Sequence, residues 1–267
     1  MTRAFVVIGD PVSHSLSPLM HSGWIADHEL DATYAALQLR AEDPVAAIRA
    51  LTGFAGANVT APHKEAAARA AGSALSAANT LVWNSDGGLT AYNTDGDGFI
   101  DSLDAAAPDW RQRVCTALIV GAGGAARDIG KAVIRAGVQD IAVVNRTVGR
   151  ALAAVQDWGR GKAHEWSALE SGFAAADLIV NTTTLGMAGA PAIDWPVAAC
   201  QPGTMIADIV YRPLETPLLA AARARGLQTV DGLGMLIHQG ARAFEIWFGV
   251  RPDAAAARAR LLQALAS

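Results

Sequence analysis

The sequence predicts an α/β protein made of two domains. Short apolar runs of strand length alternate with segments whose apolar residues recur at helical spacing, which is the pattern of βα units. A first series has strand-like runs at residues 4–8, 33–39 and 56–59 and a helix-like segment at 44–51. A second series begins after Trp110. We therefore expect two α/β domains with a boundary near residues 100–110.

The second series opens with a strand, a glycine-rich turn and a helix. Residues 116–120 form an apolar run, and apolar residues then recur at helical spacing from Ala125 to Ala136, before a stop at Gly137. The turn reads Gly121-Ala122-Gly123-Gly124-Ala125-Ala126, and residues 141–144 supply the next strand. A helix N-terminus after such a turn presents backbone N–H groups to a pyrophosphate. This context predicts a dinucleotide-binding unit of the Rossmann type, whereas the glycines alone would indicate only a tight turn.

The residues after the next strand predict which dinucleotide is bound. Sites of this type usually carry Asp or Glu about 20 residues beyond the glycine turn, where the carboxylate binds the ribose 2′-hydroxyl. This chain has Asn145-Arg146-Thr147 at that place, 24 residues after Gly121, and Arg150 one helical turn further on. A guanidinium offers a 2′-phosphate a planar set of donors, whereas a carboxylate would repel it. We expect NADP(H). The alternative, a solvated surface arginine, is disfavoured because Arg146 follows a strand.

The remaining segments complete the second domain and the C-terminal tail. Apolar runs at 177–181 and 204–210 suit parallel strands that are buried on both faces. Thr216 as N-cap, Pro217 as first helical residue and Gly226 as terminator predict a helix over 218–225. The tail predicts two helices, 235–247 and 254–265, separated by Gly249 and Pro252.

Composition favours a soluble globular protein. The 267 residues are 52% hydrophobic and 17% charged, and no stretch approaches the ~20 apolar residues that span a bilayer. The apolar start is too short for a secretory signal, so we expect a cytoplasmic protein. Cys115 and Cys200 lie far apart, which indicates neither a disulfide framework nor a zinc site. The net charge of −4 without a basic run argues against nucleic acid or an anionic membrane as partner.

Polar clusters at the ends of the N-terminal strands go beyond what a purely structural domain needs. Ser15 and Ser17 follow the first strand, Lys64 follows the third, and Asp95 closes a later polar run. Taken singly, each has an ordinary interpretation: a helix cap for the serines, a solvated charge for the lysine and a turn for Asp-Gly. Their occurrence together at strand ends points instead to a binding site.

The ordered motifs resemble those of the shikimate dehydrogenase family over essentially the whole chain. They are Gly9-Asp10-Pro11, His14-Ser15-Leu16-Ser17-Pro18, Asn58-Val59-Thr60, Pro62-His63-Lys64, Asn79-Thr80, Asn93-Thr94-Asp95-Gly96, the glycine turn, Asn145-Arg146-Thr147, Tyr211-Arg212-Pro213 and Asp231-Gly232-Leu233-Gly234-Met235-Leu236 with Gln239. The resemblance implies NADPH-dependent, reversible reduction of 3-dehydroshikimate to shikimate, a step toward chorismate and the aromatic amino acids.

The resemblance also implies roles for individual residues. Lys64 and Asp95 would form the catalytic pair. Ser15 and Ser17 would bind the substrate carboxylate, and the carboxylate or ring hydroxyls would be contacted by Thr60, Asn79, Tyr211 and Gln239. The cofactor would be bound by Gly121, Ala122, Gly123, Gly124, Ala125, Asn145, Arg146, Thr147, Arg150, Ile209, Gly232 and Met235.

The implied architecture has an N-terminal α/β substrate domain and a C-terminal Rossmann-type NADP-binding domain. Residues 1–102, completed by C-terminal helices at 235–267, would bind the substrate and perform catalysis. Residues 103–234 would bind NADP(H). The final helices would return to the N-terminal domain, and the active site would lie in the cleft between domains. The sequence leaves open whether the protein is a monomer or a homodimer.

The chemistry suits these residues on its own terms. Hydride addition to a ketone builds negative charge on oxygen, and Lys64 can both stabilise that charge and supply a proton. Asp95 would hold the ammonium in place. No metal is required, because the lysine supplies the positive charge. His14 and His63 flank the serine and lysine motifs, and we expect them to shape the loops.

Some features depart from the family pattern. The stretch between Lys64 and Asn79 is short, Ser76-Ala77-Ala78 replaces the usual Gly-Ala-Val, and Asp128 adds a negative charge near the phosphate-binding helix start. Alternative functions are a quinate/shikimate dehydrogenase, an enzyme acting on a shikimate analogue, and more remotely a non-catalytic NADPH-sensing protein. The last would have no need of both Lys64 and Asp95.

Overall fold

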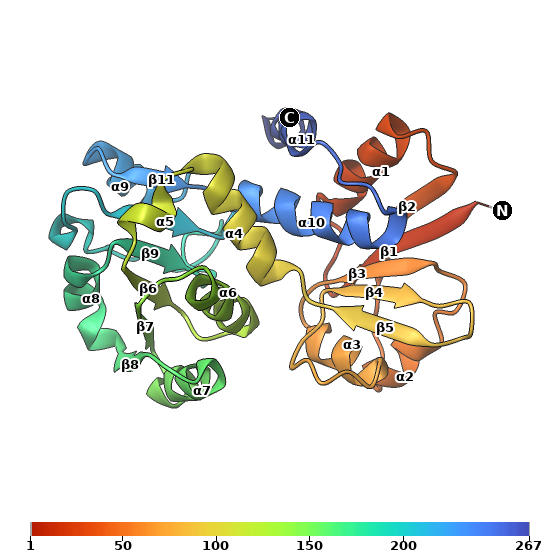
Figure 1. Cartoon of the computed structure of the whole chain (residues 1–267), viewed down its shortest axis with the longest axis horizontal. Coiled ribbons are helices and arrows are strands. Elements are labelled where there is room, and N and C mark those ends of the chain that lie inside the picture. The colour runs from red at the N-terminus through yellow and green to blue at the C-terminus, as the bar shows by residue number, and fades with distance from the viewer. Residues whose placement is uncertain (1, 267) are drawn as a thin grey trace. The chain divides into compact units, whose positions relative to one another are not determined.

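The structure, a computed structural model, describes residues 2–266. The chain forms two compact units (Figure 1). Unit 1 comprises the described residues up to Thr94 and from Gln239 onward, and unit 2 comprises Asp95–His238. The C-terminal residues from Gln239 onward therefore belong to the same unit as the N-terminal residues.

Unit 1 has a five-stranded sheet in the order β2-β1-β3-β4-β5. The first three strands are parallel, and β4 and β5 continue the sheet as an antiparallel hairpin. The strands are β1 (Arg3–Gly9), β2 (Ala32–Gln38), β3 (Gly56–Val59), β4 (Thr80–Trp83) and β5 (Leu89–Tyr92), and the helices between them are α1 (Ser17–Asp27), α2 (Pro44–Arg49) and α3 (Lys64–Ala70).

Alternating side chains of the unit 1 strands pack against helices on both faces of the sheet. Val6 and Ile8 of β1 share a core with Ile48 of α2 and the alanines of α3. The intervening Phe5 points to the opposite face, where its ring lies 4.9 Å from that of Trp247. This alternation follows from the two-residue period of a strand.

Unit 2 has a six-stranded sheet in the order β11-β10-β9-β6-β7-β8, with parallel pairing throughout. Its strands are β6 (Thr116–Val120), β7 (Asp140–Asn145), β8 (Lys162–Glu165), β9 (Leu178–Asn181), β10 (Met205–Asp208) and β11 (Gln228–Val230). Its helices are α4 (Asp95–Ala106), α5 (Trp110–Arg113), α6 (Gly124–Arg135), α7 (Val148–Trp158), α8 (Leu169–Ala175) and α9 (Pro217–Ala224), with short 3-10 turns at Trp166–Ala168 and Val197–Ala199.

Helices cover both faces of the unit 2 sheet, as expected for a doubly wound parallel sheet. One core unites α4, α6 and α7 with alternate residues of the strands, such as Ile119 and Val143. The other core unites α8 and α9 with the intervening residues, such as Leu118 and Val144. The central strands β6, β9 and β10 are buried on both sides, which explains their nearly continuous apolar sequences.

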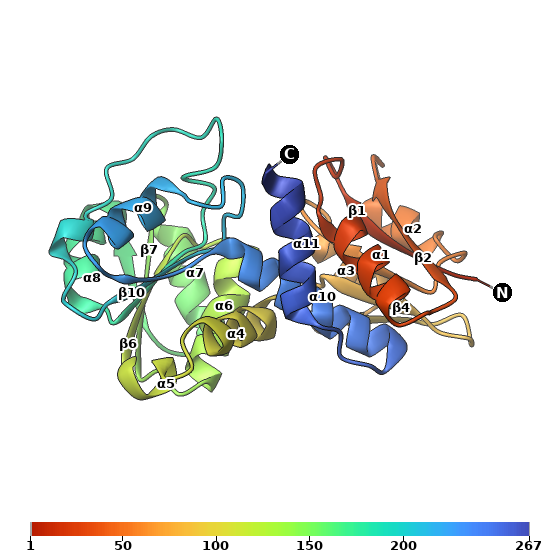
Figure 2. The same ribbon diagram turned by 90° about the horizontal axis from the view of Figure 1, so that it is seen from above.

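The C-terminal segment returns to unit 1 through α10 (Gly232–Phe248) and α11 (Ala254–Ala266). Both helices lie beside α1 (Figures 1 and 2). The indole nitrogen of Trp24 donates to the carbonyl of Asp253 at 2.9 Å, and Arg3 donates to the carbonyl of Trp247 at 2.9 Å. The predicted fold class, including the returning helices, is confirmed.

The boundaries between the units fall inside or beside helices rather than at loops. The predicted boundary after residue 102 lies within α4, which belongs wholly to unit 2 because Phe99, Ile100 and Leu103 pack into its core. A Cβ atom at Gly96 would lie 2.5 Å from the carbonyl oxygen of Asp128, so α4 and α6 approach closely from the first turn of α4. The second predicted boundary, after residue 234, lies near the start of α10, which crosses from one unit to the other.

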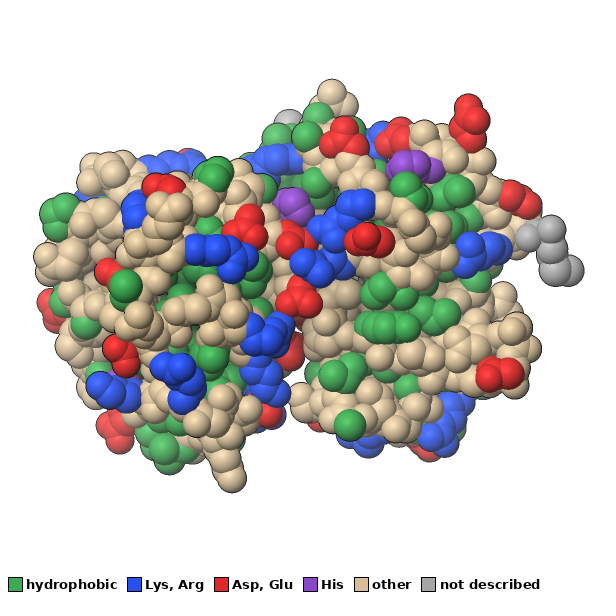
Figure 3. Space-filling model, viewed as in Figure 1, with side chains coloured by type: hydrophobic (Ala, Val, Ile, Leu, Met, Phe, Trp, Pro, Cys, Tyr) green, Lys and Arg blue, Asp and Glu red, His purple; other side chains and the backbone are tan. Residues whose placement is uncertain are grey.

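Most predicted elements appear within a few residues of their expected bounds, but the β4–β5 hairpin, β8, β11 and the helices α4, α5 and α8 were not predicted. Within the described residues, no helix is long and apolar enough to cross a membrane. Charged side chains of both signs are interspersed on the face of the molecule seen in Figure 3.

Candidate active site

One edge of the unit 1 sheet collects the polar motifs of the N-terminal half. β1 and β3 are parallel, so their carboxyl ends lie at this edge. Because β4 is antiparallel to β3 and β5 is antiparallel to β4, the amino end of β4 and the carboxyl end of β5 lie there too. The segments at this edge carry Ser15 and Ser17 after β1, Thr60 and Lys64 after β3, Asn79 before β4, and Asn93 and Thr94 after β5.

Asn79 is the centre of a buried hydrogen-bond network at this edge, with only 2% of its surface exposed. Its Oδ1 accepts from the backbone N–H of Thr94 at 2.8 Å and from the hydroxyl of Thr80 at 3.0 Å. Its Nδ2 donates to Thr94 Oγ1 at 2.9 Å and to Gln239 Oε1 at 3.2 Å. The hydroxyl of Thr94 in turn donates to the backbone carbonyl of Gln239 at 3.0 Å. The network ties α10 to the ends of β4 and β5.

Two further buried side chains, Tyr34 and Asn58, hold the backbone carbonyl of Asn79 in place. Tyr34 Oη donates to Asn58 Oδ1 at 2.6 Å, and Asn58 Nδ2 donates to the backbone carbonyl of Asn79 at 3.3 Å. The ring of Tyr34 stacks on that of His21, with centroids 4.4 Å apart. Burial lowers the pKa of His21 to about 3, and neither ring nitrogen has a hydrogen-bond partner in the part of the chain that the structure describes. His21 is therefore neutral at physiological pH.

The two serines lie where β1 leads into α1. Ser17 is buried and is the first residue of α1, whereas Ser15 is half-buried in the preceding turn. The N-cap position is held by Leu16, and the hydroxyl of Ser15 accepts a hydrogen bond from the backbone N–H of Ser17 at 3.2 Å. Ser15 thus stabilises the entry to α1 without occupying the N-cap position itself.

Lys64 begins α3 beside Asn79. The backbone carbonyl of Lys64 accepts from the N–H of Ala78 at 2.9 Å, and its side chain is half-buried. The preceding His63 is buried, with Nε2 2.9 Å from the carbonyl oxygen of Leu39, which follows β2. This contact supports the expectation that His63 shapes its loop. A Cβ atom at Gly9 would lie 2.4 Å from Thr60 Cγ2, so this glycine permits Thr60 to pack against the end of β1.

Asp95 directly follows Thr94 and begins α4, where it is buried. It belongs to unit 2, as does Tyr211, the other predicted substrate residue outside unit 1. Tyr211 is half-buried in the loop after β10, and burial raises the pKa of its phenol. The structure therefore groups Ser15, Ser17, Thr60, Lys64, Asn79 and Gln239 in one unit and assigns Asp95 and Tyr211 to the other.

The glycine turn lies at the carboxyl edge of the unit 2 sheet. Gly121 has a φ of 103°, and a Cβ atom there would lie 2.7 Å from Thr182 Oγ1, so only glycine suits this position. Gly123 is the N-cap of α6, and no side chain of a described residue caps this helix. A Cβ atom at Gly123 or Gly124 would meet no atom of the described chain within 4 Å beyond its neighbours. Gly123 and Gly124 are both exposed, so the start of α6 leaves room for a pyrophosphate.

The Asn-Arg-Thr segment adjoins this turn because β6 and β7 are paired in parallel register. The N–H of Gly121 donates to the carbonyl of Val144 at 2.8 Å, one residue before Asn145. Asn145 Nδ2 donates to the carbonyl of Thr147 at 2.9 Å, which closes the turn into α7. Arg146, Thr147 and Arg150 are exposed. Two cations and a hydroxyl thus lie beside the glycine turn, and neither guanidinium forms an ion pair with a carboxylate among the described residues, which fits a 2′-phosphate.

The order in which successive strands join the unit 2 sheet reverses beside the same glycine turn. The chain proceeds from β6 through β7 to β8 on one side and then from β9 through β10 to β11 on the other. In such sheets a ligand binds outside the carboxyl ends of the strands at the reversal, here between β6 and β9. Sequence reasoning missed Thr182, whose hydroxyl donates to Val120 O at 2.7 Å and whose Oγ1 faces Gly121. The polar run after β9 was the available signal.

A buried carboxylate supports the loops after β9 and β10. Asp208 is 2% exposed, and burial raises its pKa to about 6, although it accepts hydrogen bonds from Val210 N–H, Thr216 Oγ1 and Asn181 Nδ2 at 3.0, 2.7 and 2.9 Å. Asp208 is followed in the chain by Ile209, one of the predicted cofactor residues. A Cβ atom at Gly232 would lie 2.3 Å from the carbonyl oxygen of Ile209, which fixes the start of α10 against this loop, while Met235 is buried in the unit 2 core.

Three family models match successive parts of the chain. The shikimate dehydrogenase substrate binding domain matches residues 7–81, the shikimate/quinate 5-dehydrogenase model matches residues 106–188, and the shikimate 5′-dehydrogenase C-terminal domain matches residues 232–262. The NADP(+) shikimate dehydrogenase of Mesorhizobium japonicum is 46% identical over 264 residues, covering 96% of this chain and 94% of its own. The chain belongs to the shikimate dehydrogenase family.

Solved structures of this family have the same fold as the chain. Shikimate 5-dehydrogenase from Thermus thermophilus, in complex with NADP(H) and shikimate, is 35% identical with a TM-score of 0.88 and covers 98% of this chain and 99% of its own. Quinate dehydrogenase from Corynebacterium glutamicum, in complex with NAD, is 30% identical with a TM-score of 0.87 and covers the same shares. The family that the sequence motifs indicate is confirmed.

Proposed function

We propose that this protein catalyses the reversible, NADPH-dependent reduction of 3-dehydroshikimate to shikimate. The observation that carries the proposal is the single sheet edge of unit 1, where three strand ends present two serine hydroxyls, a threonine, a lysine and the buried amide of Asn79. A polyhydroxylated ring acid needs such a set of donors and acceptors. Membership of a family with NADP(+) shikimate dehydrogenases supports the choice of this substrate.

Ser15 and Ser17 are proposed to bind the substrate carboxylate. Their turn lies at the start of an 11-residue helix, where backbone N–H groups and the helix dipole favour an anion. Thr60, Asn79 and Gln239 would bind the carboxylate or the ring hydroxyls, with Tyr211 contributed by unit 2. The amide of Asn79 is held on both its atoms, so it would meet the substrate in a fixed orientation.

Lys64 is proposed to be the general acid of the reduction. Negative charge develops on the carbonyl oxygen as it is reduced, and an ammonium group stabilises that charge and then donates its proton. The half-buried position of Lys64 at the start of α3 excludes part of the surrounding water and strengthens this interaction. Asp95 would hold the ammonium in place.

The carboxyl edge of unit 2 is proposed to bind NADP(H). Gly121, Ala122, Gly123, Gly124 and Ala125 would approach the pyrophosphate, while Asn145, Arg146, Thr147 and Arg150 would surround the 2′-phosphate. Ile209, Gly232 and Met235 would line the nicotinamide end. The reduced nicotinamide, when bound, supplies the hydride.

An absorbance assay at the reduced-nicotinamide band tests the proposal. Purified protein is given shikimate or quinate with NADP or NAD in all four combinations. We expect shikimate with NADP to give the highest kcat/KM. A preference for quinate with NAD would replace the proposal with the function of the Corynebacterium relative, and no turnover with any pair would favour a non-catalytic role. The proposed place of action is the cytoplasm, as a monomer or homodimer.

A further inference from the structure

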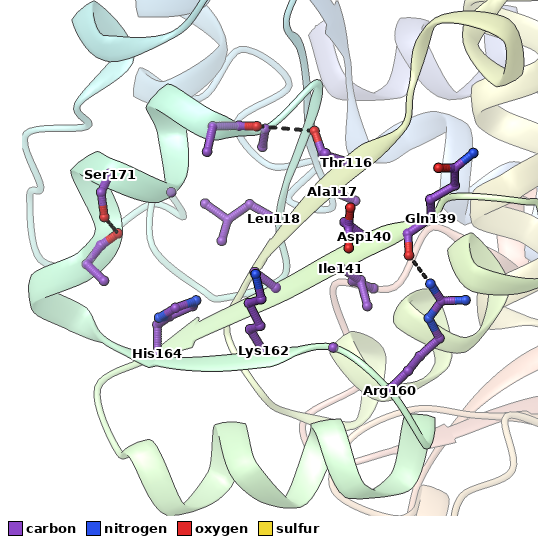
Figure 4. Close-up of a pocket in the computed structure, with 16 residues that line it drawn as sticks. Thr116, Ala117, Leu118, Gln139, Asp140, Ile141, Arg160, Lys162, His164 and Ser171 are labelled. Carbon is purple, nitrogen blue, oxygen red and sulfur yellow. Dashed lines mark hydrogen bonds between the residues drawn. The ribbon is translucent and has the colours of Figure 1, made fainter.

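Unit 2 contains a hollow of about 570 Å³ at the opposite edge of its sheet from the glycine turn. It lies over the amino ends of β6, β7 and β8 and is bounded on the other side by α8 (Figure 4). Thr116, Asp140 and Lys162 are the first residues of their strands, whereas the candidate cofactor residues follow the last residues. The hollow is therefore separate from the candidate cofactor site, although both belong to one sheet.

Small side chains create this hollow. The floor is a row of three paired residues, Leu118, Ala142 and Lys162, which share one face of the sheet. The wall is formed by Ala168, Gly172 and Ala175 at α8. A Cβ atom at Gly172 would lie 2.9 Å from Leu118 Cδ2, so the lack of a side chain at this glycine lets α8 approach the sheet closely beside Leu118. Next to Leu118, Ala142 of β7 is only partly buried.

The β8 side of the hollow is positively charged. Lys162 and His164 lie two residues apart on the same face of the strand, and Arg160 precedes them, with its guanidinium donating to the carbonyl of Gln139. The side chains of Lys162 and His164 form no hydrogen bond or ion pair with any residue that the structure describes. Asp140 is the only acid in the lining and forms no ion pair with Lys162 among the described residues. The ammonium of Lys162 and the imidazole of His164 thus lie beside the apolar side chains of Leu118 and Ala142, in a hollow of the size of a small molecule.

We propose that this hollow is a second ligand site, for a small organic anion with a flat apolar body. The body would lie on Leu118 and Ala142, and the acid group would bind Lys162 and His164. The acid group is expected on the β8 side because the side chains of Lys162 and His164 have no partner among the described residues, and a charge-assisted hydrogen bond is stronger than a neutral one. The apolar body would cover the part of β7 that α8 leaves open.

The probe for this site is 8-anilinonaphthalene-1-sulfonate, an aromatic sulfonate whose fluorescence rises in apolar surroundings. Titrations are performed with saturating NADP+, so that the cofactor site is filled. Lys162→Glu should weaken binding by roughly ten-fold or more, because it replaces a charge-assisted bond with repulsion. Ala142→Leu should do the same by filling the floor. The uncharged counterpart of the probe, N-phenyl-1-naphthylamine, should bind more weakly than the sulfonate and should respond to Ala142→Leu alone.

Lys131→Glu is the matched control, since it makes the same charge change on α6, away from the hollow. It should leave sulfonate binding unchanged, and all three variants should keep the native circular dichroism and dehydrogenase activity. Absence of NADP-resistant fluorescence, or equal binding by the unaltered protein, Lys162→Glu and Ala142→Leu, would overturn the proposal. A dimer in sedimentation that Lys162→Glu dissociates would overturn it too, by assigning the hollow to a contact between copies of the chain.

Discussion

The two units present polar sheet edges of different construction. At the unit 1 edge, buried side chains bond to one another, from Tyr34 through Asn58 to Asn79 and on to Gln239. At the unit 2 edge, the candidate cofactor groups are backbone N–H groups and exposed side chains such as Arg146 and Arg150. Groups that share hydrogen bonds are energetically coupled, whereas separate exposed groups act independently. The effects of a substitution should therefore spread through the unit 1 edge and remain local at the unit 2 edge.

The largest effect is expected for Lys64→Ala. Loss of the proposed general acid should lower kcat for 3-dehydroshikimate by about 10²- to 10⁴-fold. Substrate binding should change far less, because the group acts mainly in the transition state. Steady-state kinetics and a separate binding titration measure the two effects. A folded variant with unaltered kcat would remove Lys64 from the mechanism.

Asp95→Asn is the companion to this change. It should also lower kcat, and the double variant should lose less than the product of the single effects, because the two residues act as one unit. Fully multiplicative losses would show that Lys64 and Asp95 act independently.

Unit 2 also has a buried hydrogen-bond network, and Asp208 is at its centre. Its pKa rises from 3.8 in the unfolded chain to about 6 in the folded protein, so between these values the folded state holds more protons and rising pH destabilises it. The destabilisation should reach up to about 3 kcal/mol. Asp208→Asn cannot titrate. The free energy of unfolding of the unaltered protein minus that of the variant should therefore fall from about pH 4 to pH 7 in urea titrations. A constant difference would contradict the burial argument.

Arg146→Asp tests the exposed edge of unit 2. Loss of a charge-assisted bond to the 2′-phosphate is worth roughly 1.5 to 3 kcal/mol, so NADP affinity should fall by about one to two decades while NAD affinity improves. Arg146→Ser and Arg150→Ala should give additive losses of NADP affinity. Strong coupling between them, or equal use of NADP and NAD by the unaltered protein, would refute this account of the edge.

Ser15→Ala and Ser17→Ala should raise KM for shikimate by roughly three- to ten-fold each, the scale of one lost hydrogen bond of about 1 kcal/mol. The KM for NADP should stay nearly unchanged. Ser171→Ala, at an exposed serine of α8, is the control. A fall in thermal stability without a change in shikimate binding would assign the two hydroxyls to structure alone.

The smallest effect is expected for Tyr34→Phe. Removing the hydroxyl breaks the bond to Asn58 and should destabilise the fold by about 1 kcal/mol. Since Asn58 holds Asn79, KM for shikimate should also rise a few-fold, with kcat nearly unchanged. Tyr92→Phe removes a hydroxyl from a Tyr that is 40% exposed and should change neither quantity. A loss of stability without any change in KM would show that the network ends at Asn58.

Local patterns in the sequence predicted the βαβ unit closely. The strand at 116–120 and the N-cap Thr216 appear as expected, because a glycine turn, a cap and an apolar run act over a few neighbouring residues. The hairpin of β4 and β5 was not predicted, although Asp86-Gly87 at its turn was a usable signal. The short strands β8 and β11 gave no measurable periodicity.

The fold class, the family and the residue types at each strand end follow from the sequence alone. That α4 belongs to unit 2, and that Tyr34 and Asn58 support Asn79, depends on how the folded chain packs. The same holds for the bond between Gln239 and Asn79, which lie 160 residues apart. The two kinds of interaction differ in how far apart in the sequence their partners lie. Turns and caps are fixed by adjacent residues, whereas buried hydrogen bonds depend on which strands pair and which helix packs over them.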